Sequence, residues 1–143
     1  MRVFVDRDHN AVEFAQQLIS KLDKSINIVC LESPLDMPYP MIAKKLSELV
    51  VENENSLGIL ICKTGIGMSI VANKIKGAYA YNCKSVEDAF QFRRFNRGNI
   101  LCLGAEIISI EEAVAICNEF FNVCFDERKK GRIELIKEIE NRI

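Results

Sequence analysis

The stretch Leu57-Gly-Ile-Leu-Ile-Cys62, continued by Lys63-Thr-Gly-Ile-Gly67, decides the fold of this chain. A short, continuous apolar run of this kind predicts a strand buried on both faces of a parallel sheet. The two glycines that follow it predict a tight turn, since glycine adopts positive φ and lets the backbone approach other atoms closely. We expect a helix after this turn, so the stretch predicts a strand–turn–helix unit of an α/β protein.

Apolar runs and runs with helical spacing alternate along the rest of the chain. Further strands are expected at 2–5, 26–31, 78–81 and 99–103, and helices at 10–22, 41–52, 67–75, 86 onward, 109–125 and after a break at Gly131 up to Arg142. Ser85 and Ser109 each stand three residues before an acid, which is the spacing of a helix N-cap and its partner. The alternation predicts a three-layer Rossmann-like (flavodoxin-like) α/β fold, with five parallel strands, helices on both faces and a C-terminal helix.

Length and composition narrow the class of protein. The chain has 143 residues, 49% of them hydrophobic, and a net charge of −1, which suits a single domain over residues 1–143. Broad nucleic-acid binding needs an excess of Lys and Arg, which this balance lacks. The N-terminal stretch turns polar at Asp6, and no run approaches the roughly 20 apolar residues of a membrane helix. We therefore expect a cytoplasmic domain with neither membrane nor nucleic acid as a partner.

The cysteines do not indicate a disulfide scaffold or a metal site. There are six of them, at positions 30, 62, 83, 102, 117 and 124, in a chain too long and too apolar for a small disulfide-rich protein. No Cys-x-x-Cys pair is present, and one histidine does not complete a zinc set. Cys30, Cys102 and Cys117 lie in apolar segments and are expected to be buried.

The glycine turn is the best candidate for a binding site. N–H groups at the start of a helix have no partner within the helix and face outward, which is the geometry of an anion site. The motif lacks the third glycine of a dinucleotide fingerprint and the Gly-Lys-Ser/Thr ending of a P-loop, so a tight turn without a ligand is the alternative. Thr64 either donates a hydrogen bond to a ligand or caps the helix.

Cys62 ends the apolar strand, next to Lys63 and just before the expected helix. This position favours a thiolate, which can act as a nucleophile or as a general base. The alternative is a buried cysteine at the end of a strand with no chemical role.

Asp8 and His9 form a second polar pair at the carboxyl end of a strand, the place where ligands bind in such sheets. Their strand neighbours the Cys62 strand in a flavodoxin-like order, although a surface histidine before a helix that Asn10 caps is the alternative. The segment 95–99 precedes its strand, so it needs another subunit or a long turn to reach the same edge.

Together these motifs resemble the family of ribose-5-phosphate isomerase B and the two galactose-6-phosphate isomerase subunits. The matching stretches follow the family order over nearly the whole chain: Asp8-His9, Tyr39-Pro40, Gly58-Ile59-Leu60-Ile61-Cys62, Thr64-Gly65-Ile66-Gly67, Ala72-Asn73-Lys74, Asn96, Asn99-Ile100-Leu101 with Gly104, and Gly131-Arg132. The block around Cys62 is the most specific of them.

The resemblance implies a metal-independent aldose–ketose isomerase of a phosphorylated sugar, of the ribose 5-phosphate/ribulose 5-phosphate type, which acts through an enediolate. It implies that Cys62 is the base and that Thr64 helps to move the oxygen-bound proton. The backbone of Gly65, Ile66 and Gly67 is then the anion hole for the enediolate.

The resemblance also implies how the substrate is held. Asp8 and Tyr39 match contacts to sugar hydroxyls, His9 and Arg132 match phosphate contacts, and Asn96 is a further binding residue. Sites of the family form between subunits, so a homodimer or tetramer is the expected assembly.

Three positions and one short stretch depart from the family pattern; the stretch is Asp6-Arg7, which is more polar than usual. Phe95 stands where the family has its ring-opening histidine, Ile136 where it has a second phosphate-binding arginine, and Lys63 where glycine is usual. Lys63 either crowds the anion hole or supplies the missing positive charge, and we count it among the substrate-binding candidates. The chain is then a complete isomerase, the cysteine-bearing subunit of a divided galactose-6-phosphate isomerase with a histidine-bearing partner, or a non-catalytic phosphosugar-binding protein.

Overall fold

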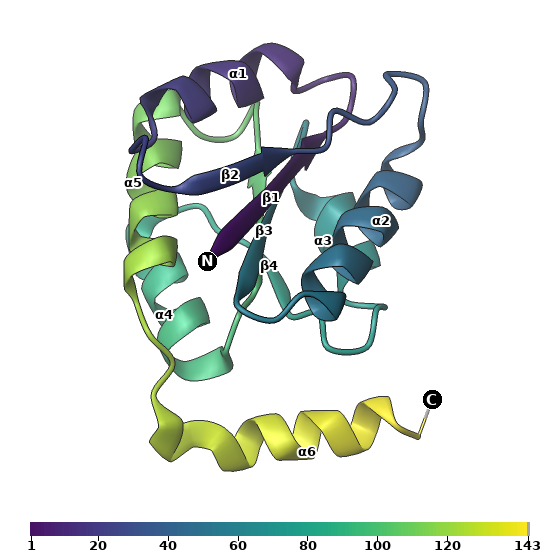
Figure 1. Cartoon of the computed structure of the whole chain (residues 1–143), viewed down its shortest axis with the longest axis vertical. Coiled ribbons are helices and arrows are strands. Elements are labelled where there is room, and N and C mark those ends of the chain that lie inside the picture. The colour runs from purple at the N-terminus through teal and green to yellow at the C-terminus, as the bar shows by residue number, and fades with distance from the viewer. Residues whose placement is uncertain (143) are drawn as a thin grey trace.

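A five-stranded parallel sheet with helices on both faces forms the centre of the molecule (Figure 1). The computed structural model describes residues 1–142. The elements are β1 (Arg2–Arg7), α1 (Val12–Lys21), β2 (Asn27–Cys30), α2 (Tyr39–Glu52), β3 (Ser56–Cys62), α3 (Ile66–Ala72), β4 (Ala80–Asn82), α4 (Val86–Asn96), β5 (Ile100–Gly104), α5 (Ile110–Asn122), the 3-10 turn η1 (Glu127–Lys129) and α6 (Lys130–Glu140). This arrangement confirms the predicted α/β fold.

The strand order places β3 in the middle of the sheet. The order is β2-β1-β3-β5-β4, and every neighbouring pair is parallel. β1 and β3 are neighbours as predicted, with Arg7 opposite Ile61. The last two strands are exchanged relative to the flavodoxin order, because β5 inserts between β3 and β4. The carboxyl end of β3 is therefore flanked by the ends of β1 and β5.

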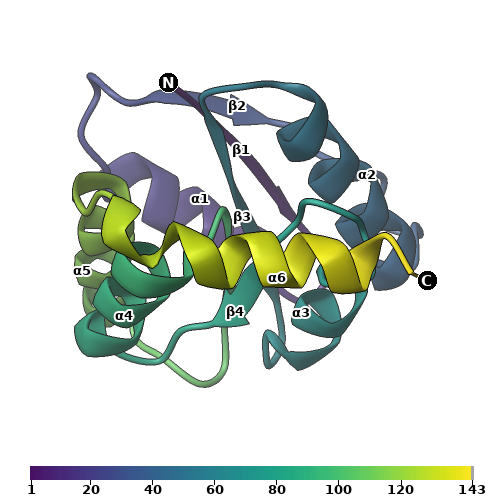
Figure 2. The same ribbon diagram turned by 90° about the horizontal axis from the view of Figure 1, so that it is seen from below.

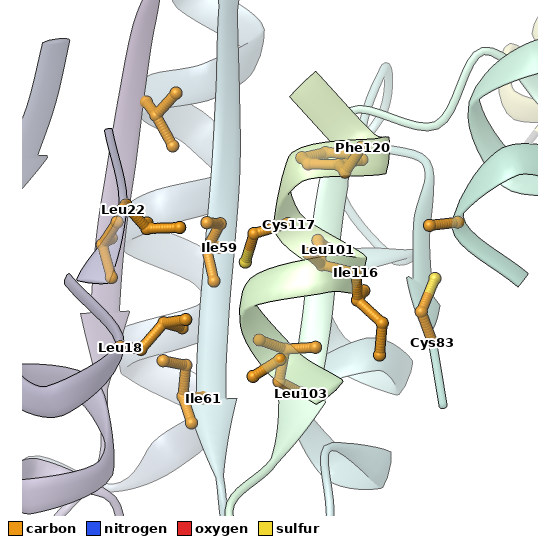
Figure 3. Packing of buried hydrophobic residues seen from close by; sticks show 14 of the residues in the cluster. Leu18, Leu22, Ile59, Ile61, Cys83, Leu101, Leu103, Ile116, Cys117 and Phe120 are labelled. Atoms are coloured by element: carbon orange, nitrogen blue, oxygen red, sulfur yellow. The ribbon is translucent and has the colours of Figure 1, made fainter. Parts of the chain in front are cut away.

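β3 also divides the core into two layers, because successive side chains of a strand point to opposite faces. Ile59 and Ile61 lie in the layer under α1, α4 and α5, in the same cluster as Cys117 of α5 (Figure 3). Leu60 and Cys62 lie in the other layer, under α2 and α3. Each fully buried aliphatic side chain of these layers stabilises the fold by about 1.5–3 kcal/mol. The register of β3 thus directs Cys62 toward α2 and α3.

Two predicted helix caps are confirmed. The Asp88 amide donates to Ser85 Oγ at 3.0 Å at the start of α4. Ser109 and Glu112 form a reciprocal capping box at the start of α5. A cap of this type contributes about 1 kcal/mol, so these serines explain where the two helices begin.

Apart from α6, four helix limits differ from the prediction by two or more residues, and one of them is the start of α2 at Tyr39 instead of Met41. α1 begins at Val12, because the Asn10 amide donates to Asp8 Oδ1 at 2.9 Å and the residue lies in a turn instead of capping the helix. α3 ends at Ala72, so it is shorter than expected. α5 ends at Asn122, since Val123 has extended backbone angles.

Gly131 does not break the chain, because it lies within the first turn of α6. The start of this segment is set earlier by Asp126, whose side chain accepts from the Arg128 amide at the head of η1. Nothing lies within 4 Å of a Cβ built on Gly131. The helix therefore passes through an exposed glycine at a cost of about 1 kcal/mol relative to alanine.

Cys30 is exposed, which corrects the expectation that it is buried. It ends β2, which is an edge strand whose residues are half-buried or exposed. Cys102 and Cys117 are buried as expected, because they lie on the inner strand β5 and on the core face of α5.

α6 lies across the edge of the sheet at which the strands begin (Figures 1 and 2). Ile133 of this helix is buried, whereas Leu135 is 61% exposed and Ile139 is 60% exposed. Among residues 1–142, no helix combines the length and the apolar character needed to cross a membrane. α6 therefore presents apolar side chains outward rather than to the core of its own chain.

Candidate active site

The turn after β3 holds the Cys62 sulfur against a backbone amide. Gly65 has φ of 80° and is the N-cap of α3, so the sharp turn requires glycine here. Its N–H donates to Cys62 Sγ at 3.1 Å, and the Cys62 side chain is buried. The Ile66 amide donates to Thr64 Oγ1 at 3.3 Å, so the threonine hydroxyl lies at the head of α3. The predicted strand–turn–helix unit is present with the thiol at its centre.

Asn82 holds the other side of this turn, and sequence reasoning missed it. Its Nδ2 donates to the Thr64 carbonyl at 2.9 Å, and a Cβ on Gly65 would come within 2.5 Å of Asn82 Oδ1. Gly104 makes room for this contact, because a Cβ there would lie 2.5 Å from the Thr64 carbonyl oxygen. The sequence shows only that a polar residue ends β4. The strand order is needed to see that β5 lies between β3 and β4, and that the turn after β3 extends past β5 to contact Asn82.

Tyr39 lies directly against the first turn of α3. It begins α2, and a Cβ built on Gly67 would lie 2.4 Å from Tyr39 Cε1 and 2.8 Å from its hydroxyl oxygen. The side chain is 42% exposed, so one side of the ring packs on the backbone while the rest faces solvent. The structure thus brings Tyr39 to the glycine turn, and its contact to a sugar hydroxyl stays a prediction.

Asp8 and His9 lie at the same edge of the sheet. The Asp8 amide donates to the Ile61 carbonyl at 3.1 Å, which extends the pairing of β1 with β3 by one residue. Asp8 is 6% exposed, whereas His9 is exposed. With Tyr39 and the segment 35–40, these two residues line a cavity of about 430 Å³.

Lys63 points along the rim of the turn toward Glu106. Lys63 Nζ and Glu106 Oε2 are 3.8 Å apart, and both side chains are more than half exposed. The Glu106 amide also donates to the Lys63 carbonyl at 3.1 Å, so the loops after β3 and β5 are joined here. In this conformation the lysine side chain contacts a carboxylate and does not fill the turn. Ile66, three residues further along the chain, is exposed.

The other cysteines of the core differ from Cys62 in their surroundings. Burial raises the pKa of the thiols of Cys83, Cys102 and Cys117, the last to about 12. These buried thiols are therefore poor nucleophiles near neutral pH. Among residues 1–142, no three His, Cys, Asp or Glu side chains gather as they would around a metal ion.

Asn96 and Arg132 lie at the opposite edge of the sheet and do not join this group within one chain. Asn96 ends α4, and its Nδ2 donates to the Gln91 carbonyl at 3.1 Å. Arg132 is exposed on α6. Asn96 and Ile136 line a groove of about 590 Å³ between α4, β4 and α6. Phe95 packs edge-to-face on Phe90, with ring centroids 5.8 Å apart.

Comparison with known proteins agrees with the sequence motifs. The family described as Ribose/Galactose Isomerase matches residues 3–136. A protein of Listeria innocua named ribose-5-P isomerase B is 33% identical, covering 99% of both chains. A protein of Mycoplasma pneumoniae named probable ribose-5-phosphate isomerase B is also 33% identical, covering 87% of this chain and 84% of its own.

Solved structures of similar proteins share the whole fold. The type B ribose 5-phosphate isomerase of Trypanosoma cruzi superimposes with a TM-score of 0.92 at 32% identity, and each chain is covered completely. Ribose-5-phosphate isomerase B of Mycoplasma genitalium, solved with bound ribulose-5-phosphate, gives a TM-score of 0.87 at 29% identity over 99% of this chain and 97% of that one. These matches confirm the resemblance and the enzyme class that it implied: the chain belongs to the ribose/galactose isomerase family.

Proposed function

We propose that this chain interconverts an aldose phosphate and a ketose phosphate, of the ribose 5-phosphate/ribulose 5-phosphate type, through an enediolate and without a metal. The observation that carries the proposal is the Cys62 sulfur, which accepts the Gly65 amide at the head of a glycine turn. The names of the similar proteins support the substrate class, as does the ribulose-5-phosphate bound to the Mycoplasma genitalium enzyme.

In this proposal Cys62 takes a proton from one of the two reacting carbons and returns it to the other. An amide that donates a hydrogen bond to sulfur stabilises negative charge on the sulfur. In the proposed reaction the Gly65 amide therefore favours the thiolate form of Cys62, which is the form that acts as a base. The backbone of Gly65, Ile66 and Gly67 then forms the anion hole for the developing enediolate oxygen, which is where preorganised donors lower a barrier most. The Gly65 and Ile66 amides, which donate to Cys62 Sγ and Thr64 Oγ1 in this structure, turn to the substrate when it binds. Thr64 moves the proton between the two oxygens, and its hydroxyl is already at the head of α3.

The cavity beside the turn holds the rest of the substrate. Asp8 and Tyr39 bind sugar hydroxyls, because the buried Asp8 carboxyl and the Tyr39 phenol both line this cavity and Tyr39 packs on Gly67. His9 contacts the phosphate from the rim, and Lys63 supplies a positive charge when it leaves Glu106.

A second copy of the chain completes the site. Asn96 and Arg132 lie at the opposite edge of their own sheet, so they reach a Cys62 turn only in a neighbouring subunit. The exposed apolar side chains of α6, Leu135, Ile136 and Ile139, support a homodimer or a larger assembly. Large apolar groups on one helix face are typical of a surface that a partner covers.

Phe95 favours a second candidate function. Its phenyl ring cannot transfer a proton, so ring opening either proceeds without a protein acid or depends on a histidine from a different chain. The second candidate is therefore the cysteine-bearing subunit of a divided galactose-6-phosphate isomerase.

Proton exchange tests these functions directly. The purified chain is incubated in deuterated water with ribose 5-phosphate or galactose 6-phosphate, and NMR follows deuterium at C1 and C2. We expect exchange with ribose 5-phosphate in the wild type and none in Cys62→Ser. Activity only after a histidine-bearing partner is added supports the divided enzyme. If neither the wild type nor Cys62→Ser is active, even with the partner present, the chain is not an isomerase. The remaining hypothesis is then a non-catalytic phosphosugar-binding protein.

A further inference from the structure

Asp6 is a buried charged residue that the proposed reaction does not use. It lies in β1, two residues before Asp8, and its side chain is fully inaccessible to solvent. A buried carboxyl is tolerated only when hydrogen bonds or an opposite charge compensate for the lost water. The partners of Asp6 therefore indicate what this residue holds in place.

These partners are Ser33, in the loop between β2 and α2, and Arg7, whose Nη1 lies 3.6 Å from Asp6 Oδ1. The Ser33 amide donates to Asp6 Oδ1 at 3.2 Å, and the Ser33 hydroxyl donates to Asp6 Oδ2. Arg7 completes the set: its amide donates to Asp6 Oδ1 at 2.9 Å, and its Nη1 donates to the Ser33 carbonyl at 2.9 Å. Lys45 of α2 donates to Ser33 Oγ at 3.2 Å. The Asp6–Ser33 clamp, as we call this network, occupies every polar group of Ser33.

The Asp6–Ser33 clamp lies next to a strained residue, Glu32, in the loop between β2 and α2. Glu32, immediately before Ser33, has φ of 48°, a left-handed conformation that is costly for a residue with a side chain. Such a conformation persists only when the surrounding contacts determine it. Because the bonds to Asp6 and Arg7 fix Ser33 on one side of Glu32, they set the direction in which the loop leaves β2.

The loop that leaves Ser33 leads to Tyr39, the first residue of α2. Residues 35–40 form the wall of the cavity that faces Asp8 and His9, and the Tyr39 ring ends this wall against Gly67. The catalytic turn, in contrast, is held by Asn82 and by the close approach to Gly104. The clamp therefore fixes the substrate wall independently of the turn that carries Cys62.

We propose that Asp6 is a positioning residue, which acts through Ser33 to hold the loop carrying Tyr39 against the substrate. The proposal rests on the isomerase function for its kinetic consequence. Loosening the wall weakens substrate binding, whereas the turn and the Cys62 thiol stay in place. The expected signature is a raised KM with little change in kcat.

Kinetics of four variants test this role. We expect Asp6→Ala and Ser33→Ala each to raise KM for ribose 5-phosphate about tenfold with kcat within about twofold. Asp6→Asn keeps one acceptor oxygen and should lie between Asp6→Ala and the wild type. The Asp6→Ala/Ser33→Ala double variant should be no worse than either single one, because both remove the same interaction.

Asn53→Ala is the matched control for general loss of stability. Asn53 also makes two side-chain hydrogen bonds, to Leu49 and from Arg2, but at the far end of α2. It should lower the denaturation midpoint and leave KM unchanged. An unchanged KM in Ser33→Ala, or an equal rise in Asn53→Ala, overturns the positioning role.

Hydrogen exchange keeps this test separate from the proposed reaction. In Ser33→Ala the amides of Met37 and Met41, which donate to the Pro34 and Pro38 carbonyls, should exchange faster than in the wild type, while those of 57–62 stay protected. Unchanged exchange at Met37 and Met41 contradicts the clamp even if the enzyme is active. A wild type without isomerase activity, but with the predicted exchange pattern, contradicts the reaction and leaves the clamp standing.

Discussion

The carboxyl and amino edges of the sheet differ in the chemical groups that they present. The carboxyl edge has a thiol under an amide, a buried carboxyl and a tyrosine packed on a glycine turn. The amino edge has an exposed arginine, a phenylalanine in place of a histidine and an apolar helix face. Neither edge holds a complete set of groups for binding a phosphosugar and moving its protons.

The difference between the two edges follows from the topology of the sheet. Parallel strands collect polar groups at their carboxyl ends, so one edge becomes reactive. The returning helix α4 places its last residues at the other edge, next to α6. In the proposed function, the groups at the amino edge contribute to the site of a neighbouring subunit, so variants at the two edges should have different kinetic consequences.

Cys62→Ser should have the largest effect. Removing a general acid–base group typically costs about 10²–10⁴-fold, so we expect kcat to fall about 10³-fold with KM little changed. Cys30→Ser, which changes an exposed thiol at the edge strand, is the control and should retain full activity. Residual activity above one tenth of the wild type in Cys62→Ser would assign the base to another residue.

Arg132→Ala should act on KM rather than on kcat. A lost hydrogen bond to a charged group is worth about 1.5–3 kcal/mol, which corresponds to a KM about ten- to a hundredfold higher. Steady-state kinetics on ribose 5-phosphate measure this change. Lys130→Ala, an exposed lysine at the start of the same helix, is the control. A variant of Arg132 with normal KM would remove the amino edge from substrate binding.

Gly65→Ala should disturb the turn itself. A side chain at φ of 80° is strained by about 1–3 kcal/mol, and the new Cβ would displace Asn82. We expect kcat to fall about tenfold, with loss of stability visible in thermal melts. Gly131→Ala, at an open position in α6, is the matched substitution and should be neutral or stabilising. If kcat of Gly65→Ala is normal, the turn geometry is not catalytic.

Lys63 and Glu106 should give the smallest effect, because exposed ion pairs contribute about 0–1 kcal/mol. Lys63→Ala should raise KM by about threefold, and Glu106→Gln should lower it by a similar factor since the lysine is released toward the phosphate. Raising the salt concentration should shrink both differences. A lower KM in Lys63→Ala would mean that the lysine obstructs the site.

Much of this molecule follows from local patterns in the sequence. The apolar run of β3, the caps at Ser85 and Ser109 and the glycines of the turn are local signals, and each has the structure that it predicts. The exposure of Cys30 was mispredicted, because its burial depends on which strand forms the sheet edge. Gly131 was mispredicted since the start of α6 is set several residues earlier.

The site was predictable where chain neighbours or paired strands define it. Cys62, Thr64 and the glycines lie in one segment, and Asp8 is brought to them by the pairing of β1 with β3. Asn82 and the clamp at Asp6 could not be predicted, because they act across strands or loops whose order no local pattern reveals.

Mixing two impaired variants tests the central claim most directly, namely that the two edges meet in one site across a subunit boundary. Cys62→Ser and Arg132→Ala are unfolded together, refolded, and assayed at ribose 5-phosphate concentrations far below KM of the Arg132 variant. In a twofold dimer, half of the molecules are mixed and each has one intact site, so we predict recovery of about a quarter of the wild-type activity. Activity no greater than the average of the two separate variants would contradict the shared site.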